Sequence, residues 1–153
     1  KGIVSAIKYA VVRRDAGDDA YLRKLVSLVD TSRIISGIGE QPAIVHVRDF
    51  GLGGFTSGCV CVAPRLSQAM LAAVRRQDWA EAERIRAVFK PLEDLRNAIN
   101  PIRVLHQAVE GAGIAETGPL LPLLTNVDAA DVPAIATAAL DLLAADTRGI
   151  HGV

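Results

Sequence analysis

The sequence predicts an α/β fold in which a small parallel β-sheet is followed by a run of helices. Short apolar segments alternate with helical patterns over the first half of the chain, which is the arrangement of consecutive βαβ units. These segments lack a clean polar–apolar alternation, so both faces of the sheet are expected to be covered. Aromatic residues make up only 4% of the 153 residues, so the core must consist mainly of Ala, Val, Ile and Leu.

Three segments are predicted to be buried strands, and a helix is expected after each of the first two. The strands cover residues 2–12, 33–39 and 54–62. Asp18 or Asp19 can cap a helix over residues 20–29, because the apolar residues of that segment share one face. Pro42 suits the first turn of a second helix, which should end near Phe50 before a glycine-rich stretch.

From residue 64 onwards the sequence predicts only helices. They are expected over residues 65–76, 79–99, 101 to 111 or 113, and from 132 to at least 142. Asp78, Asn100 and Asp131 stand where helix N-caps are expected. Pro91 lies inside the second of these helices and should kink it, because a proline removes one backbone hydrogen bond.

The composition excludes several classes of protein. Seventeen basic and seventeen acidic residues give a formal net charge of zero, which argues against a nucleic-acid-binding surface and against a polybasic membrane anchor. No apolar run reaches the roughly 18 residues of a membrane span, and no secretory signal segment is present. Two neighbouring cysteines cannot form a disulfide framework, so a cytoplasmic protein is expected.

The predicted sheet is too small to be complete. The outer edge of the first strand would expose a row of unpaired backbone groups in an apolar segment, which natural proteins avoid. The sequence therefore favours part of a larger (β/α)8 barrel over an independent three-stranded domain. Residues 1–77 are expected to be the barrel part, and residues 78–153 a helical extension.

Lys8 is the residue most suggestive of chemistry. It lies near the carboxyl end of the first strand, where (β/α)8 barrels place their active sites. Period-2 alternation puts it on the same face as Val4 and Ala6, whose small side chains leave room for a ligand. A desolvated lysine amine can attack a carbonyl group and form a Schiff base. The alternative is a lysine at a strand end with its ammonium group in water.

Four segments resemble the dihydrodipicolinate synthase / N-acetylneuraminate lyase family, in order and at matching spacing. Residues 2–8 resemble the sixth strand, whose lysine forms the Schiff base, and residues 36–40 the seventh strand with its glycine loop. Residues 51–58 resemble the turn into the eighth strand, and residues 100–104 an Asn-Pro-Ile-Pro-Val segment. The resemblance implies that the chain supplies the last three βα units of the barrel and the carboxyl-terminal helices.

The resemblance also implies an activity. A class I lyase or aldolase would use Lys8 as its catalytic amine on a 2-keto acid such as pyruvate, without a cofactor or a metal. Gly39 would allow close backbone approach beside the imine, and Thr56 and Ser57 would bind the substrate. Members are commonly tetramers. The alternative for Thr56 and Ser57 is a pair of hydroxyls bonded to their own loop.

The sequence departs from the family in two ways. Tyr9 follows the lysine where the family often has an acidic residue. The tyrosine proton relay, the carboxylate-binding turn and the substrate-clamping arginine would precede the sixth strand, so these 153 residues alone are expected to be inactive. Condensation, cleavage and dehydration all remain open. Tyr9 with the two hydroxyls mildly favours a hydroxylated sugar-acid substrate, as in the dehydratase and sugar-acid aldolase branches of the family, and a sugar-acid dehydratase is the alternative function. A non-catalytic 2-keto acid-binding relative is a further alternative, and a small domain that binds a phosphate or a nucleotide is a weaker one.

Other candidate sites are poorly supported. Cys59 and Cys61 lack a nearby histidine or second cysteine pair, so buried structural cysteines are expected in place of a zinc site. The three histidines are far apart, and His46 is expected on a surface helix.

Overall fold

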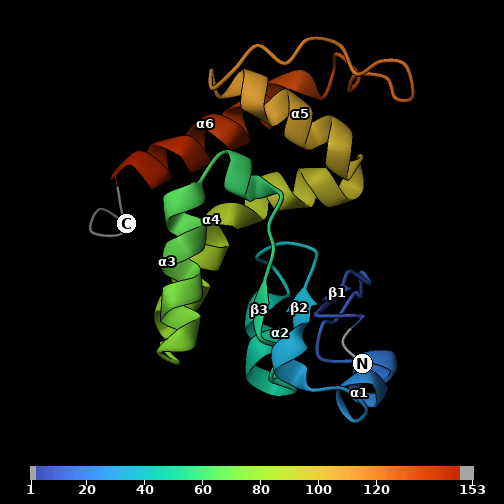
Figure 1. The fold of residues 1–153 in the computed structure, drawn as a ribbon. Helices are drawn as coiled ribbons and strands as arrows, with labels where there is room; N and C mark the ends of the chain where they lie inside the picture. Colours follow the sequence, from blue (N-terminus) through green and yellow to red (C-terminus); the bar gives the residue numbers. More distant parts are fainter. Residues whose placement is uncertain (1–2, 149–153) are drawn as a thin grey trace.

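The computed structural model describes residues 3–148. It contains a three-stranded parallel sheet followed by four longer helices (Figure 1). The strands β1 (Ile7–Tyr9), β2 (Ile34–Ser36) and β3 (Gly54–Phe55) lie in the order β1-β2-β3. Ile7 pairs with Ile34, and Ile35 pairs with Gly54. Gly2, the first residue of the sixth-strand resemblance, and His151 lie outside the described residues. The division into parts at residues 77 and 78 stays a prediction.

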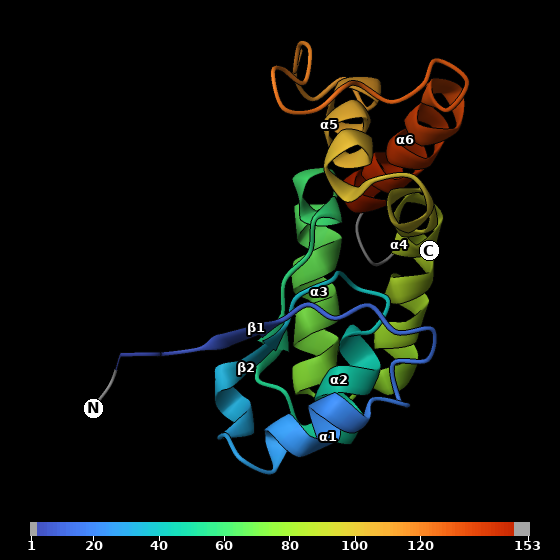
Figure 2. The same ribbon diagram turned by 90° about the vertical axis from the view of Figure 1, so that its right-hand side faces the viewer.

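All three strands are shorter than predicted, and β2 covers only Ile34–Ser36 of the expected residues 33–39. The first was expected over residues 2–12, but residues 3–6 are exposed and run away from the rest of the molecule (Figure 2). The third was expected to reach residue 62, but Gly58 adopts helical backbone angles and begins the 3-10 helix η2 (Cys59–Cys61). Cys59 is fully buried there. The apolar residues after Gly58 therefore fill the core from a turn, and their hydrophobicity alone is no evidence for a strand.

The two helices predicted between the strands are present, but they cover only one face of the sheet, whereas both faces were expected to be covered. Helix α1 (Ala20–Val26) begins where the Asp19 carboxylate accepts a hydrogen bond from the Leu22 amide at 2.9 Å. It ends three residues earlier than expected. A short 3-10 helix η1 (Thr31–Arg33) precedes β2. Helix α2 (Ala43–Phe50) follows Pro42 and ends at Gly51, whose φ of 72° is the left-handed conformation that glycine adopts easily.

The second half of the described chain is helical, as predicted. It contains α3 (Pro64–Arg75), α4 (Trp79–Ala98), α5 (Pro101–Gly111) and α6 (Val132–Arg148). Asp78 and Asn100 cap α4 and α5 through their side-chain oxygens. Helix α4 changes direction partway along its length (Figure 1), and Pro91 inside it explains the kink. Within residues 3–148, no helix is both long and apolar enough to cross a membrane.

The buried apolar residues form two clusters. The larger joins α2, η2 and the four longer helices, and Phe89 is its largest fully buried side chain. The smaller lies between the sheet and helices α1 and α2 and includes Tyr9, Leu22 and Ile34. Helices α5 and α6 lie at the end of the molecule away from α1 and α2 (Figures 1 and 2). The carboxyl ends of the strands thus open toward the helical half.

Candidate functional site

Lys8 is the middle residue of β1 and lies on the face of the sheet opposite to Tyr9. The Tyr9 ring is buried in the smaller core, and its hydroxyl donates a hydrogen bond to the Asp19 carboxylate. The Lys8 side chain is exposed and packs against Gly37, the residue directly after β2. A Cβ atom at position 37 would lie 2.7 Å from Cγ and 2.8 Å from Cε of Lys8. The glycine therefore provides the space that the lysine stem occupies.

A cavity of about 530 Å³ brings the predicted site residues together. Lys8, Gly39, Thr56 and Ser57 all line it, although Lys8 and Thr56 are far apart in the sequence. Backbone hydrogen bonds fix the two loops at this edge: the Thr56 amide donates to Ser36 O at 2.8 Å, and the Gly39 amide donates to Thr56 O at 3.1 Å. Tyr9 does not line the cavity, so it gives no support to a hydroxylated sugar-acid substrate.

The two hydroxyl groups of this cavity have different surroundings. Thr56 is exposed and makes no side-chain hydrogen bond to another residue in the range 3–148. Ser57 is half-buried, and its Oγ lies 2.6 Å from Oε2 of Glu40 and accepts the Val60 amide at 3.2 Å. The alternative of a hydroxyl bonded to its own loop thus describes Ser57, whereas the Thr56 hydroxyl is open to a ligand.

Gly39 is approached closely by a side chain of the protein, whereas a close approach to the imine was expected. Its φ of 107° favours glycine, and a Cβ atom there would lie 1.8 Å from Oε1 of Glu93. The group packed against Gly39 is therefore a carboxylate of helix α4. Gly39 also lines the cavity that contains Lys8. Its role beside an imine stays a prediction.

A buried charged cluster behind this loop was missed from the sequence. Glu40 and Glu93 are fully buried, and Arg96 is 8% exposed. The Glu93 carboxylate accepts the backbone amides of Glu40 at 3.0 Å and Gln41 at 2.9 Å, and Arg96 donates to it at 3.4 Å. Spacing on α4 could have found it, because Glu93 and Arg96 continue the buried stripe of Ile85, Phe89 and Leu92.

Burial dominates the electrostatics of this cluster. Desolvation raises the pKa of Glu93, and repulsion from Glu40 raises it further, while the backbone amides and Arg96 lower it. Desolvation also raises the pKa of Glu40 against the lowering effect of the Ser57 and Ser67 hydroxyls. The two carboxyl groups titrate as a pair, and burial together with their mutual repulsion favours one proton on the pair.

The expectation for His46 is wrong. Its ring is 1% exposed, and its Nδ1 lies 2.8 Å from the Ser36 hydroxyl of β2. His46 lies four residues before Phe50 on the same side of α2, and its ring contacts the rings of Tyr9 and Phe50. Burial lowers the pKa of His46, so the ring is neutral and joins α2 to β2.

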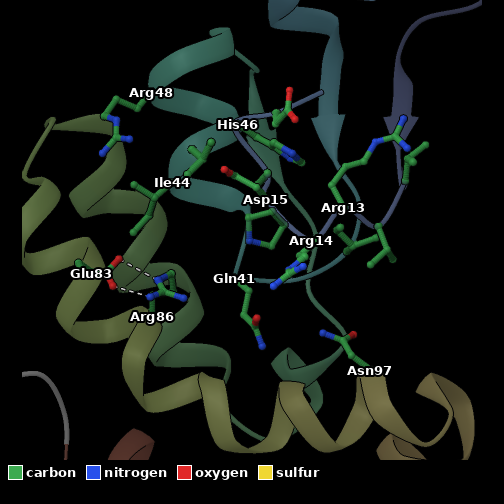
Figure 3. A pocket seen from close by; sticks show the side chains of 17 residues that line it. Arg13, Arg14, Asp15, Gln41, Ile44, His46, Arg48, Glu83, Arg86 and Asn97 are labelled. Carbon is green, nitrogen blue, oxygen red and sulfur yellow. Dashed lines mark hydrogen bonds and ion pairs between the residues drawn. The ribbon is translucent and has the colours of Figure 1, made fainter. Parts of the chain in front are cut away.

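A larger cavity of about 780 Å³ lies between the segment after β1, helix α2 and helix α4 (Figure 3). Ion pairs engage several of its charged residues: Arg86 faces Glu83 at 2.5 Å, as Figure 3 shows, and Arg13 pairs with Asp19 at 2.9 Å. None of the four predicted site residues lines it. The smaller cavity with Lys8 is therefore the candidate active site.

The cysteines take no part in either cavity. Cys59 lies in the larger core, as expected, and burial raises the pKa of its thiol, so it is an unreactive structural residue. The expectation is wrong for Cys61, which is exposed. Within the part of the chain that the structure describes, no group of three or more His, Cys, Asp and Glu side chains is placed to hold a metal ion.

No protein-family model and no curated protein matches the sequence. Solved structures do match. The dihydrodipicolinate synthase from Oceanobacillus iheyensis aligns over 92% of this chain and 47% of its own, with 24% identity and a TM-score of 0.75. The dihydrodipicolinate synthase from Bacillus clausii aligns over 88% and 45%, with 26% identity and a TM-score of 0.67.

A third match extends the likeness to an aldolase. The sialic acid aldolase from Ruminococcus gnavus, solved as a catalytic lysine mutant, aligns over 86% of this chain and 44% of its own, with 16% identity and a TM-score of 0.67. The chain spans about half the length of each of these relatives. The fold matches their barrels, and the resemblance of the sequence motifs to the dihydrodipicolinate synthase / N-acetylneuraminate lyase family is confirmed.

Proposed function

We propose that this chain is the carboxyl-terminal part of a Schiff-base lyase or aldolase that acts on a 2-keto acid such as pyruvate. One observation carries the proposal. A single cavity at the carboxyl ends of three parallel strands contains Lys8, Gly39, Thr56 and Ser57, the residues to which the family resemblance assigns a role. The strands β1, β2 and β3 are then the sixth, seventh and eighth strands of a barrel.

Lys8 is the catalytic amine in this proposal. Its neutral Nζ attacks the C2 carbonyl of the keto acid, and loss of water gives an imine that becomes protonated. The iminium group withdraws electrons, so C3 can lose a proton and form an enamine. That carbon then attacks an aldehyde, and the reverse sequence cleaves the same bond. Loss of a neighbouring hydroxyl as water is the third outcome, as in a sugar-acid dehydratase.

Other groups of the cavity suit an anionic substrate. The exposed Thr56 hydroxyl is free to donate to a carboxylate. Arg96 also lines the cavity, where its positive charge favours an anionic substrate. Lys8 itself is exposed, so its desolvation is assigned to the remaining strands of the barrel.

Borohydride trapping tests the proposal on the full-length protein. We expect pyruvate and borohydride to give a reduced adduct at Lys8, found by peptide mass spectrometry. Lys24, which is exposed at the end of α1, serves as the internal control and should stay unmodified. Lys8→Arg keeps the positive charge but removes the nucleophile, and should abolish the adduct.

The outcomes separate the two classes of function. A folded protein that binds pyruvate without an adduct at Lys8 is a non-catalytic 2-keto acid-binding relative. Equal labelling of Lys8 and Lys24 contradicts a specific catalytic amine.

A further inference from the structure

The buried cluster behind the Gly39 loop contacts the candidate site through one side chain. Oε2 of Glu40 lies 2.6 Å from Oγ of Ser57, which lines the Lys8 cavity. Oε1 of Glu40 lies 2.8 Å from Oγ of Ser67 on helix α3. Both carboxyl oxygens of Glu40 are therefore engaged by hydroxyl groups, each of which can donate or accept.

Glu93 has a different set of partners, and all of them donate. Its two oxygens accept the backbone amides of Glu40 and Gln41, and Arg96 lies 3.4 Å from Oε1. A cation and two backbone amides favour an ionised carboxylate more than hydroxyl groups do, because the hydroxyl groups around Glu40 can accept as well as donate. Glu93 is therefore the ionised member of the pair.

The charges of the cluster balance only if one proton is present. Glu40 and Glu93 with Arg96 would otherwise carry one uncompensated negative charge in a fully buried site, which is costly. Arg86 also interacts with Glu93, but its charge is paired with Glu83 at 2.5 Å. Cys59 and Cys61 of η2 face the cluster as well, and desolvation raises the pKa of both thiols, so they add no charge near neutral pH. Since Glu93 is ionised, the proton belongs on Glu40.

We propose that Glu40 is a positioning residue whose proton orients the Ser57 hydroxyl. A protonated Glu40 donates to Oγ of Ser57, which also accepts the Val60 amide, so both lone pairs of that oxygen are used. The hydroxyl hydrogen of Ser57 must then point into the Lys8 cavity and donate to the carboxylate of the substrate. Loss of the proton reverses the bond, and Ser57 donates to Glu40.

The proposal depends on the proposed function only for the substrate, and the proton itself can be tested without activity. Infrared spectroscopy of the full-length protein at neutral pH should show a protonated carboxyl band that disappears in Glu40→Gln. The contribution of Glu40 to the free energy of unfolding, read as the difference between the wild type and Glu40→Gln, should fall as the pH rises above about 4.5, because the unfolded Glu40 ionises while the folded one keeps its proton. Glu40→Gln should lose that part of the pH dependence.

Glu40→Gln is the informative variant because its amide reproduces a protonated carboxyl. The NH₂ group donates to Ser57, and the carbonyl accepts from Ser67, so we expect the variant to fold and to keep the wild-type affinity for pyruvate. Its half-maximal pyruvate concentration in borohydride trapping should stay constant at alkaline pH, where that of the wild type rises. Glu93→Gln should be less stable than Glu40→Gln, because its NH₂ group would face a backbone amide.

Two serine variants complete the test. Ser57→Ala should raise the half-maximal pyruvate concentration about tenfold or more, since it removes a hydrogen bond to a charged group. Ser67→Ala contacts the same carboxyl but does not line the cavity, so it should leave that concentration unchanged.

Three results would overturn the proposal. They are an infrared band that persists in Glu40→Gln, a Glu40→Gln protein that fails to fold at neutral pH, and a Ser57→Ala protein with wild-type pyruvate dependence. If Lys8 gives no adduct but the infrared band and the stability behave as expected, the proposed function fails, whereas the assignment of the proton to Glu40 is supported.

Discussion

The position of the Lys8 side chain depends on Gly37, a residue that carries no side chain. Its stem lies against Gly37, which follows β2, and the Gly37 amide donates to Tyr9 O at 2.7 Å. The position of the amine is thus fixed by backbone pairing between β1 and β2. Helices α1 and α2 cover the other face of the sheet and leave the Lys8 face open to a ligand.

Gly37→Ala should impair the lysine without unfolding the protein. The new methyl group would displace Cγ and Cε of Lys8, a flexible exposed side chain, and would lie 3.0 Å from Tyr9 O, so the loss of unfolding free energy should be about 1–3 kcal/mol. A displacement of about 1 Å at a reacting group lowers rates roughly 10- to 100-fold, and we expect a loss of that order in the rate of borohydride trapping.

The matched control is Gly54→Ala on β3, where an added methyl group meets no atom within 4 Å. It should trap pyruvate at the wild-type rate. Equal effects of the two substitutions would show that Gly37 does not act through Lys8.

The segments between secondary-structure elements were harder to predict than the elements themselves. Helices α3 to α6 follow from apolar spacing and capping residues, because these signals are local in the sequence. The end of β3 at Phe55 does not, because Gly58 turns the chain so that Leu105 of α5 can pack on it, a contact between distant segments.

The candidate site also has a part that the sequence predicts and a part that it does not. Lys8, Gly39, Thr56 and Ser57 follow from motifs that resemble a known family, and the structure brings them to one cavity. The carboxyl pair behind them joins residues 53 positions apart, and no local pattern links them. The stripe on α4 can indicate that Glu93 is buried, but it cannot show which distant residue Glu93 meets.

The contact between α2 and β2 makes one pH-dependent contribution to stability. Burial keeps His46 neutral in the folded state, whereas it gains a proton below about pH 6.5 in the unfolded state. The folded pKa is the lower one, so this stability is present above pH 6.5 and is lost as the pH falls. The slope from a single group is at most about 1.4 kcal/mol per pH unit.

His46→Gln should therefore flatten the fall of the unfolding free energy between about pH 6.5 and pH 5, measured by chemical denaturation. The amide of Gln can still bond to Ser36, which limits the loss at neutral pH. His106→Gln on α5, where the ring is only partly buried, is the control and should keep the acid-side slope. An unchanged slope in His46→Gln would contradict the assignment.

At the scale of the whole molecule, the sheet has an edge that the described chain leaves uncovered. Tyr9 O accepts the Gly37 amide, and alternate residues of a parallel strand direct their backbone groups to opposite sides. The backbone N–H and C=O of Lys8 therefore point to the outer edge of β1. Ile3 and Val4 beside this strand are 96% and 61% exposed, which is unusual for apolar residues next to a parallel sheet.

In a closed barrel another strand would pair with this edge of β1, and hydrogen exchange can test that pairing. If another parallel strand pairs with β1 in the full-length protein, the Lys8 amide should exchange slowly there and rapidly in residues 1–153 expressed alone. The Gly37 amide, which bonds to Tyr9 inside the sheet, is the internal control and should be protected in both.

The isolated chain should also associate with itself as its concentration rises, measured by sedimentation, because an exposed strand edge pairs with other strands. A monomeric chain whose Lys8 amide exchanges equally in both proteins would mean that no strand covers β1, and the barrel would have to be abandoned. The desolvation of the lysine amine would then have no structural source, because it depends on the strands that close the barrel around it.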